Sequence, residues 1–158
     1  DHITIRVLER DFKVSAASFF QVNTIMAEKM VEHLSTCLPV SVSTTLFDVY
    51  CGVGLFSAFF APKCERVIGI ESSLSACEDF TVNLDEFDNP PRAGIERHAL
   101  DAIVQLKPQI IAYVSCDPST LARDAARLIQ GGYKLKEVTP FDLFPQTYHI
   151  ESISLFEK

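Results

Sequence analysis

The sequence YVSCDPSTLARD, residues 113–124, places a thiol between a short apolar run and a segment with helical character. Asp117 is a favoured N-cap residue and Pro118 suits the first helical turn, so we expect a helix to begin next to Cys116. A thiol near the partial positive charge of a helix N-terminus favours its thiolate form, which makes Cys116 a candidate nucleophile. The alternative is a small buried apolar residue. We expect that state for three other cysteines: Cys37, Cys64 and Cys77.

A second candidate site follows the apolar run at residues 44–50. The sequence FDVYCGVGLFS (47–57) places Gly52 and Gly54 where a ligand could approach the backbone, before a helix start with free N–H donors. Glu71 ends the next apolar run, where an acidic residue commonly binds ribose hydroxyls. The spacing is not GxGxxG, so GVG alone also fits an ordinary turn before a helix. Glu71 favours a cofactor that carries a nucleoside.

Near the C-terminus, Glu151 lies in a run that is otherwise apolar at Ile150, Ile153 and Leu155. A carboxylate there is either a solvated residue of an edge strand or a general base. His149 has the same choice between a structural and a catalytic role. The residues alone leave both choices open.

The elements that would position these residues alternate between strands and helices, which predicts βαβ units and a parallel sheet covered on both faces. The core strands are predicted at 46–50, 66–71, 110–114, 133–138 and 149–156, after a lead-in pair at 3–7 and 12–14. We expect the last two core strands to form an antiparallel pair at the sheet edge. Helices are predicted at 23–38, 73–87, 95–106 and 119–130, and Gly131-Gly132 ends the last one.

Local signals also predict how two of these helices begin and face the core. Asn23 or Thr24 is expected to cap the first helix, and Ser72 or Ser73 the second. The first helix should present one apolar face. Its residues are Ile25, Met26, Met30, Val31 and Leu34.

Composition narrows the class of protein. A chain of 158 residues that is 47% hydrophobic can bury one core, so we expect one domain, with residues 1–40 as a lead-in and 41–158 as its core. The net charge of −7 argues against a broad nucleic-acid footprint. Five cysteines without a CxxC pair predict reduced thiols, no zinc site and a cytoplasmic location. No apolar run reaches the roughly 20 residues of a membrane helix. Because the chain opens without Met, we expect it to be part of a longer protein.

Several stretches together resemble the RNA (uracil-5-)methyltransferase family, whose members use S-adenosylmethionine to methylate uracil C5 in tRNA or rRNA. These stretches are FKVSAASFFQVNT, FDVYCGVGLFS, VIGIESS, PPRAG, YVSCDPSTLARD and FPQTYHIESISLFEK, in the family's order. The resemblance covers the catalytic domain only. It implies a Rossmann-like, three-layer α/β class I methyltransferase fold with a mostly parallel sheet. It also implies an RNA substrate that is bound with the help of a separate domain.

The resemblance also assigns roles to single residues. Cys116 matches the nucleophile that adds to uracil C6, and Glu151 matches the base that removes the C5 proton. The positions that contact S-adenosylmethionine are matched by Gln21, Tyr50, Gly52, Gly54 and Glu71.

One departure from the family lies before Pro90. The family places an Asp at the end of a central strand there, whereas this chain has Asn89 and no preceding apolar strand. A unit on the order of 30 residues is missing. We therefore expect one or two fewer strands, and either a gap in the core or direct pairing of 110–114 with 46–50. Asn89 remains a candidate cofactor contact by its position.

Three hypotheses follow. The first is a uracil C5 methyltransferase catalytic domain. The second is a non-catalytic domain that keeps the fold but has an incomplete cofactor pocket, as the gap before Pro90 suggests. The third is a thiol hydrolase that uses Cys116 with His149, which would leave Glu71 and the glycine turn unexplained.

Overall fold

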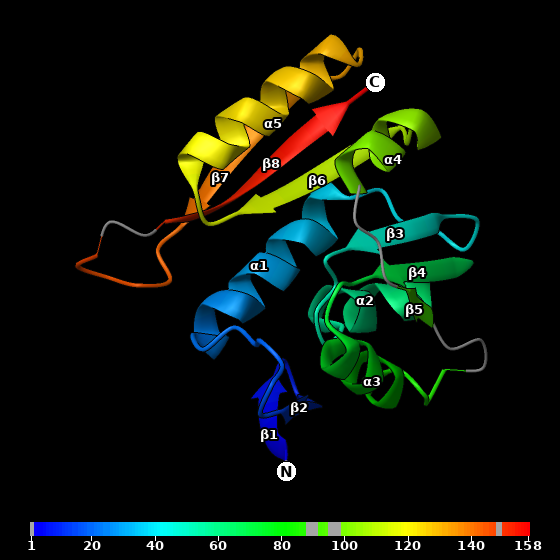
Figure 1. The fold of residues 1–158 in the computed structure, drawn as a ribbon, viewed down its shortest axis with the longest axis vertical. Helices are drawn as coiled ribbons and strands as arrows, with labels where there is room; N and C mark the ends of the chain where they lie inside the picture. Colours follow the sequence, from blue (N-terminus) through cyan, green and yellow to red (C-terminus); the bar gives the residue numbers. More distant parts are fainter. Residues whose placement is uncertain (1, 88–91, 95–98, 148–149) are drawn as a thin grey trace. The chain divides into compact units, whose positions relative to one another are not determined.

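The computed structural model describes residues 2–87, 92–94, 99–147 and 150–158 (Figure 1). The chain forms two compact units, Asp1–Arg97 and His98–Lys158. None of the described helices is long and apolar enough to cross a membrane.

Unit 1 begins with an antiparallel hairpin of β1 (His2–Val7) and β2 (Arg10–Ser15). The two residues between the strands, Leu8 and Glu9, both have positive φ angles, of 46° and 62°. Positive φ at both loop positions is the geometry that matches a two-residue hairpin loop to the twist of its strands. Leu8 packs partly buried against the core of unit 1, and its N–H donates to Glu28 of the following helix.

The helix α1 (Thr24–Cys37) follows, and Asn23 caps it by accepting from the Met26 N–H. Its buried residues are Ala27, Met30, Val31 and Leu34. Three of the five residues predicted for the apolar face, Met30, Val31 and Leu34, are therefore buried. The prediction was wrong for Ile25, which is 66% exposed. Ile25 lies in the first turn, before the helix reaches the core.

The rest of unit 1 confirms the predicted strand–turn–helix–strand order. It consists of β3 (Thr45–Val49), α2 (Leu55–Phe60), a short 3₁₀ turn (Ala61–Lys63), β4 (Arg66–Ile70), α3 (Leu74–Asn83) and β5 (Arg92–Gly94). Ser73 caps α3. The sheet order is β3-β4-β5, and both pairs are parallel. The three-residue strand β5 was not predicted, and residues 88–91 before it lie outside the described part of the chain.

The core of unit 1 is closely packed between its sheet and α3. A Cβ atom on Gly69 of β4 would lie 2.8 Å from the Cys51 Sγ and 2.8 Å from the Phe80 ring. Phe80, on α3, is fully buried, and Cys51 is 8% exposed. The absence of a side chain at residue 69 is therefore what allows the helix and the turn after β3 to meet on this face of the sheet.

Unit 2 contains α4 (Ala99–Leu106), β6 (Ile110–Ser115), α5 (Pro118–Gln130), β7 (Lys134–Phe141) and β8 (Glu151–Glu157). The sheet order is β6-β8-β7 and both pairs are antiparallel, which confirms the predicted closing pair. Direct pairing of 110–114 with 46–50 was one of the two alternatives expected at the gap before Pro90. It is not formed among the described strands, where β8 is the one partner of β6 and β4 the one partner of β3. The start predicted for the third helix, 95–98, lies outside the described residues.

The helix α5 packs on the sheet of unit 2 through an apolar cluster. Leu128, Tyr133 and Phe156 are its buried members, and Ile111 and Tyr113 of β6 pack against them.

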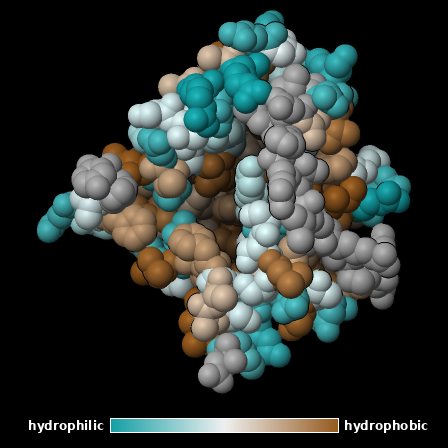
Figure 2. Space-filling view, in the orientation of Figure 1, coloured by the Kyte–Doolittle hydropathy of each residue, from teal (hydrophilic) through white to brown (hydrophobic). Residues whose placement is uncertain are grey.

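Apolar residues also remain on the surface of the chain, where hydrophobic and hydrophilic residues are interspersed (Figure 2). Among the most exposed are Val42, Phe19, Val22 and Leu74.

Candidate active site

The turn after β3 has a backbone conformation that would let a ligand approach it closely. Tyr50, Gly52 and Gly54 all have positive φ angles, of 61°, 54° and 91°. Tyr50 is 64% exposed, and its N–H donates to the Ile70 carbonyl at 2.6 Å, which joins the turn to the end of β4. A tyrosine in the left-handed region is uncommon and strained, and such strain gathers at functional sites.

The two glycines of this turn are required for different reasons. A Cβ atom on Gly54 would lie 2.5 Å from Leu84 and 2.9 Å from Phe80, so packing against α3 excludes a side chain there. A Cβ atom on Gly52 would meet nothing closer than the Phe19 carbonyl oxygen at 4.0 Å. Gly52 therefore leaves open space above its backbone, which a ligand could occupy.

Glu71, at the end of β4, is the electrostatic anchor of the turn. Its carboxylate accepts from the backbone N–H groups of Gly52 (2.9 Å), Ser72 (2.6 Å) and Ser73 (2.8 Å). Burial alone would raise the pKa of Glu71, but these backbone donors outweigh it and hold the pKa below its ordinary value. Glu71 is therefore an ionised, 8% exposed carboxylate that fixes the glycine turn. Oε2 accepts only the Gly52 bond among these three, so it keeps capacity for a further donor.

Asp48 of β3 performs a capping role that the sequence analysis missed. The helix α2 has Gly54 at its N-cap and therefore no capping side chain. Instead, the Asp48 carboxylate accepts from the Ser57 N–H (3.2 Å) and the Ser57 hydroxyl (2.6 Å). Burial raises the pKa of Asp48, and the bonds from Ser57 act against that rise. A strand residue thus satisfies the first turn of the helix, and the glycines are free to shape the loop.

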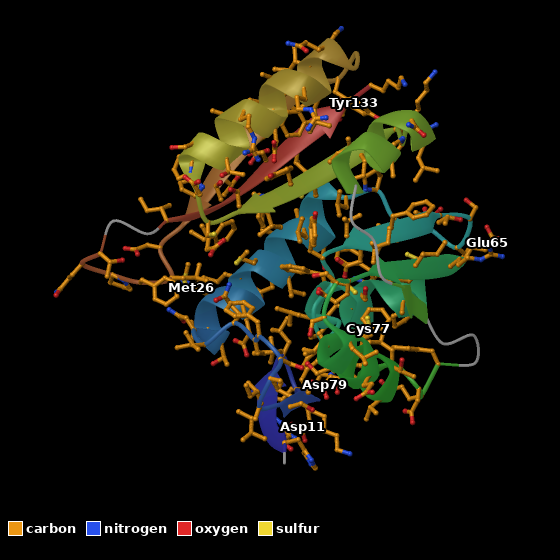
Figure 3. The ribbon with its side chains drawn as sticks, viewed as in Figure 1. Asp11, Met26, Glu65, Cys77, Asp79 and Tyr133 are labelled. Atoms are coloured by element: carbon orange, nitrogen blue, oxygen red, sulfur yellow. The ribbon has the colours of Figure 1, made fainter. Side chains whose placement is uncertain are left out.

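Two residues of α3 anchor the segment that leads to Gln21. Asp79, labelled in Figure 3, is 6% exposed. It accepts from the Ser15 N–H (2.9 Å), the Ser15 hydroxyl (2.7 Å) and the Ser18 hydroxyl (2.5 Å). Asn83 donates to the Val53 carbonyl in the glycine turn at 3.0 Å. Gln21, half-buried, follows Ser18 in the chain. These contacts were missed because each joins residues far apart in the sequence.

In unit 2, Cys116 and Glu151 lie at the same end of the β6–β8 ladder. The last register pair is Ser115 with Ser152, so Cys116 is one residue beyond it on one strand and Glu151 one residue before it on the other. Residues that oppose each other in an antiparallel pair point to the same face of the sheet. Asp117 caps α5 by accepting from the N–H groups of residues 119 and 120, as predicted.

The two groups differ in their surroundings. Cys116 is exposed, whereas Glu151 is half-buried between β6 and β7, where it pairs with Phe141. Burial raises the pKa of the Glu151 carboxyl, which brings it nearer to the range of a general base. His149 and Asn89 lie outside the described residues. All five cysteines are free, and no group of three potential metal-ligating side chains occurs among the described residues.

Parallel strands, a glycine turn and an acidic residue at the tip of the second strand define a Rossmann-like α/β protein of the kind that binds nucleoside cofactors. The comparison with protein families is more specific. A sequence model described as "tRNA (Uracil-5-)-methyltransferase" matches residues 2–89 and 76–158, and the chain belongs to this family.

Individual relatives agree with this membership. The chain is 34% identical to an uncharacterized RNA methyltransferase of Chlorobaculum tepidum, over 99% of this chain and 39% of the relative. It is 35% identical to one of Caldanaerobacter subterraneus, over 100% and 41%. The chain therefore spans about two fifths of the length of the curated relatives it matches.

Solved structures support the fold. The tRNA (uracil-54, C5)-methyltransferase of Pyrococcus abyssi, solved with S-adenosyl-L-homocysteine, superposes with a TM-score of 0.82 at 24% identity, over 98% of this chain and 44% of that one. The tRNA m1G37 methyltransferase of M. jannaschii superposes with a TM-score of 0.68 at 13% identity, over 99% and 56%. Both are class I methyltransferases, so the predicted Rossmann-like fold class is confirmed. The described core strands nevertheless form two sheets, a parallel one in unit 1 and an antiparallel one in unit 2, where one mostly parallel sheet was expected.

The comparisons also bear on the expected gap before Pro90. The family matches this chain in two overlapping pieces that meet at residues 76–89. The region aligned with the Chlorobaculum relative is 189 residues long, whereas this chain has 158, so at least 31 aligned positions have no counterpart here. That length agrees with the predicted loss of a unit of about 30 residues.

Proposed function

We propose that residues 1–158 form the catalytic domain of an S-adenosylmethionine-dependent RNA (uracil-5-)methyltransferase that acts in the cytoplasm. The observation that carries the proposal is the placement of Cys116 and Glu151 at one end of the β6–β8 ladder, in a chain of this family. The substrate would be a uracil of tRNA or rRNA. Because the chain has a net charge of −7, we expect a separate domain to supply most of the contacts that bind the RNA.

The cofactor proposal rests on unit 1. The turn itself fits such a cofactor, because Gly52 leaves room above its backbone and Glu71 Oε2 keeps acceptor capacity for a ribose hydroxyl. Tyr50, Gly54 and Gln21 complete the set of residues that would hold the cofactor, and Asn89 belongs to it by its position in the sequence. Bound there, S-adenosylmethionine would supply a methyl group on an electrophilic sulfonium.

The residues of unit 2 would carry the covalent chemistry. The Cys116 thiolate adds to uracil C6, and the electron pair of the C5–C6 double bond moves into an enolate that makes C5 nucleophilic. After C5 has gained a methyl group, the Glu151 carboxylate accepts the C5 proton. The electrons of that C–H bond restore the double bond and expel the Cys116 thiolate. The target base has to leave its stack to reach these groups.

A covalent trap tests this chemistry. With a uracil-containing RNA and S-adenosylmethionine, Cys116→Ser should lose both adduct formation and methyl transfer, because an alcohol at neutral pH does not add to C6. Glu151→Gln should still form the adduct but stall at proton removal, so a protein–RNA band should accumulate on a denaturing gel. Cys64→Ser, at a half-buried thiol outside the proposed site, is the matched control and should behave as the wild type. An adduct that persists in Cys116→Ser would refute the proposal.

The second candidate function is a non-catalytic domain, which is favoured by the absence of at least 31 positions that the Chlorobaculum relative carries. A calorimetric titration with S-adenosylmethionine separates the two candidates. Under the enzyme proposal the wild type binds, Glu71→Gln binds at least about tenfold more weakly, and Glu65→Gln, at an exposed carboxylate before β4, binds as the wild type. Binding too weak to detect in the wild type would favour the non-catalytic domain.

A further inference from the structure

Cys116 lies in a two-residue gap between a strand and a helix. The strand β6 ends at Ser115 and the helix α5 begins at Pro118, so residues 116 and 117 belong to neither element. The last register pair of β6 with β8 is Ser115 with Ser152. The sheet ladder therefore stops one residue before the thiol, and the helix starts two residues after it. The position of Cys116 depends on contacts that side chains make across this gap.

The Ser115 side chain makes such a contact. Its hydroxyl accepts from the Asp117 N–H at 3.2 Å and donates to the Asp117 carbonyl at 3.0 Å. Both bonds join the residue before Cys116 to the residue after it, so they close two small rings around the Cys116 backbone. Ser115 is 8% exposed, so water competes little for its hydroxyl. We call this pair of bonds the Ser115–Asp117 clamp.

The other end of the clamp is fixed to α5. The Asp117 carboxylate accepts from the Ser119 N–H at 2.9 Å, the Thr120 N–H at 3.3 Å and the Thr120 hydroxyl at 2.7 Å. The side chain of Asp117 therefore holds the first turn of the helix, while its backbone holds Ser115. Through these bonds the clamp ties the backbone of Cys116 to both the strand and the helix.

A second contact keeps α5 on β6 independently of the clamp. The Tyr113 hydroxyl of β6 donates to the Asp124 carboxylate of α5 at 2.7 Å. Asp124 is 7% exposed, and its other oxygen accepts from the Arg123 side chain at 2.9 Å. Loss of the Ser115 hydroxyl should therefore loosen residues 116–117 without releasing the helix from the sheet.

We propose that Ser115 is a positioning residue, whose clamp holds the Cys116 sulfur where it can add to uracil C6. This inference rests on the proposed function, because it takes Cys116 to be the nucleophile. A serine hydroxyl has one proton, and Ser115 already donates it to the Asp117 carbonyl, so Ser115 acts through Cys116 and not on the substrate. A displacement of about 1 Å at a reacting group can slow a reaction about a hundredfold. The clamp should therefore affect the rate of the reaction and not the binding of RNA.

Amide hydrogen exchange tests the clamp without substrate or cofactor. In Ser115→Ala the Asp117 N–H loses its acceptor and should exchange at least about fivefold faster. The Leu128 N–H, in a later turn of α5, should exchange as in the wild type. Ser154→Ala is the matched control, because Ser154 is fully buried in the same sheet and its hydroxyl has no hydrogen-bond partner. An unchanged exchange rate at Asp117 in Ser115→Ala would overturn the clamp.

Single-turnover methylation of a uracil-containing RNA with S-adenosylmethionine tests the positioning role. At saturating RNA, Ser115→Ala should react at least about tenfold more slowly than the wild type. The RNA concentration that gives half the maximal rate should stay within about twofold of the wild-type value, because Ser115 does not bind the RNA. Ser154→Ala should react as the wild type, and Ser115→Thr, which keeps the hydroxyl, should recover most of the rate.

The outcomes separate this inference from the proposed function. If Cys116→Ser is inactive but Ser115→Ala reacts as fast as the wild type, the positioning role is overturned and the proposed function stands. The same holds if Ser115→Ala is slow only because it needs more RNA. A wild type that transfers no methyl group, or a Cys116→Ser variant that still does, would overturn both.

Discussion

Glu71 holds the glycine turn without the help of a ligand, so replacing it with glutamine should loosen the turn even when no cofactor is bound. The carboxylate accepts from three backbone N–H groups, those of Gly52, Ser72 and Ser73. Glutamine has nearly the same shape, but it is neutral and only one of its two terminal atoms is an acceptor. If its oxygen keeps the bonds from Ser72 and Ser73, its NH₂ group faces the Gly52 N–H and that bond is lost.

The magnitude follows from these contacts. A hydrogen bond to a charged group contributes about 1.5–3 kcal/mol and a neutral one about 0.5–1.5 kcal/mol. Losing the charge should therefore cost about 1 kcal/mol for each bond that remains, and losing the Gly52 bond about 2 kcal/mol. Because Glu71 is 8% exposed, water can replace little of this. We expect Glu71→Gln to destabilise unit 1 by about 2–4 kcal/mol at neutral pH.

Amide hydrogen exchange at Gly52 and Ser73 measures this loss within unit 1, with Glu65→Gln as the control. The pKa of folded Glu71 lies below its ordinary value of 4.5, so its contribution is complete above pH 4.5 and is lost as the pH falls through the folded pKa. The difference between wild type and Glu71→Gln should accordingly be constant near neutral pH and shrink in acid. Equal exchange rates at pH 7, or a difference that persists unchanged into acid, would refute the role given to the carboxylate.

Three further predictions concern other contacts. Asp79→Ala removes the acceptor of Ser15 and should cost about 2–4 kcal/mol, visible as faster amide exchange at Ser15; an unchanged rate would contradict the anchoring role. Gly69→Ala places a methyl group 2.8 Å from the Cys51 sulfur and should lower stability by about 1–3 kcal/mol in a urea melt, whereas a wild-type midpoint would show that the core can expand. Burial raises the pKa of Glu151, so the ionised carboxylate is disfavoured in the folded state. This loss of stability is absent below the ordinary pKa of 4.5 and complete above the raised pKa of the folded state. Glu151→Gln should thus be more stable than the wild type at neutral pH and equal to it near pH 4, and an equal gap at both would count against a buried Glu151.

Features set by neighbouring residues could be predicted from the sequence. The caps of α1 and α3 were predicted to within one residue, and that of α5 as Asp117, because a capping side chain reaches only two or three residues along the chain. The parallel pair β3–β4 followed from two apolar runs around a glycine turn. The structure places Cys116 and Glu151 at one end of the β6–β8 ladder, and their catalytic roles stay a prediction.

What could not be predicted depends on contacts between distant segments. The bonds of Asp79 to Ser15 and of Asn83 to Lys13 join residues 64 and 70 positions apart, and no local pattern distinguishes these side chains from solvated ones. No role was predicted for Asp48, which caps α2 from the preceding strand because the N-cap there is a glycine. Ile25 fitted the apolar period of α1, yet periodicity does not reveal where a helix first meets its core.

The anchoring of the β1–β2 hairpin by α3 has a consequence for synthesis in the cell. The hairpin contacts Asp79 and Asn83 across 64 to 73 residues of chain, so these contacts form only after α3 has left the ribosome. At elongation rates of about 5–20 residues per second this delay is about 3–15 s. A two-stranded hairpin alone is marginally stable, so Val7 and Phe12, both fully buried in the finished protein, stay accessible during that interval. A nascent chain that stalls before α3 is complete should therefore be a target for chaperones that bind short apolar segments.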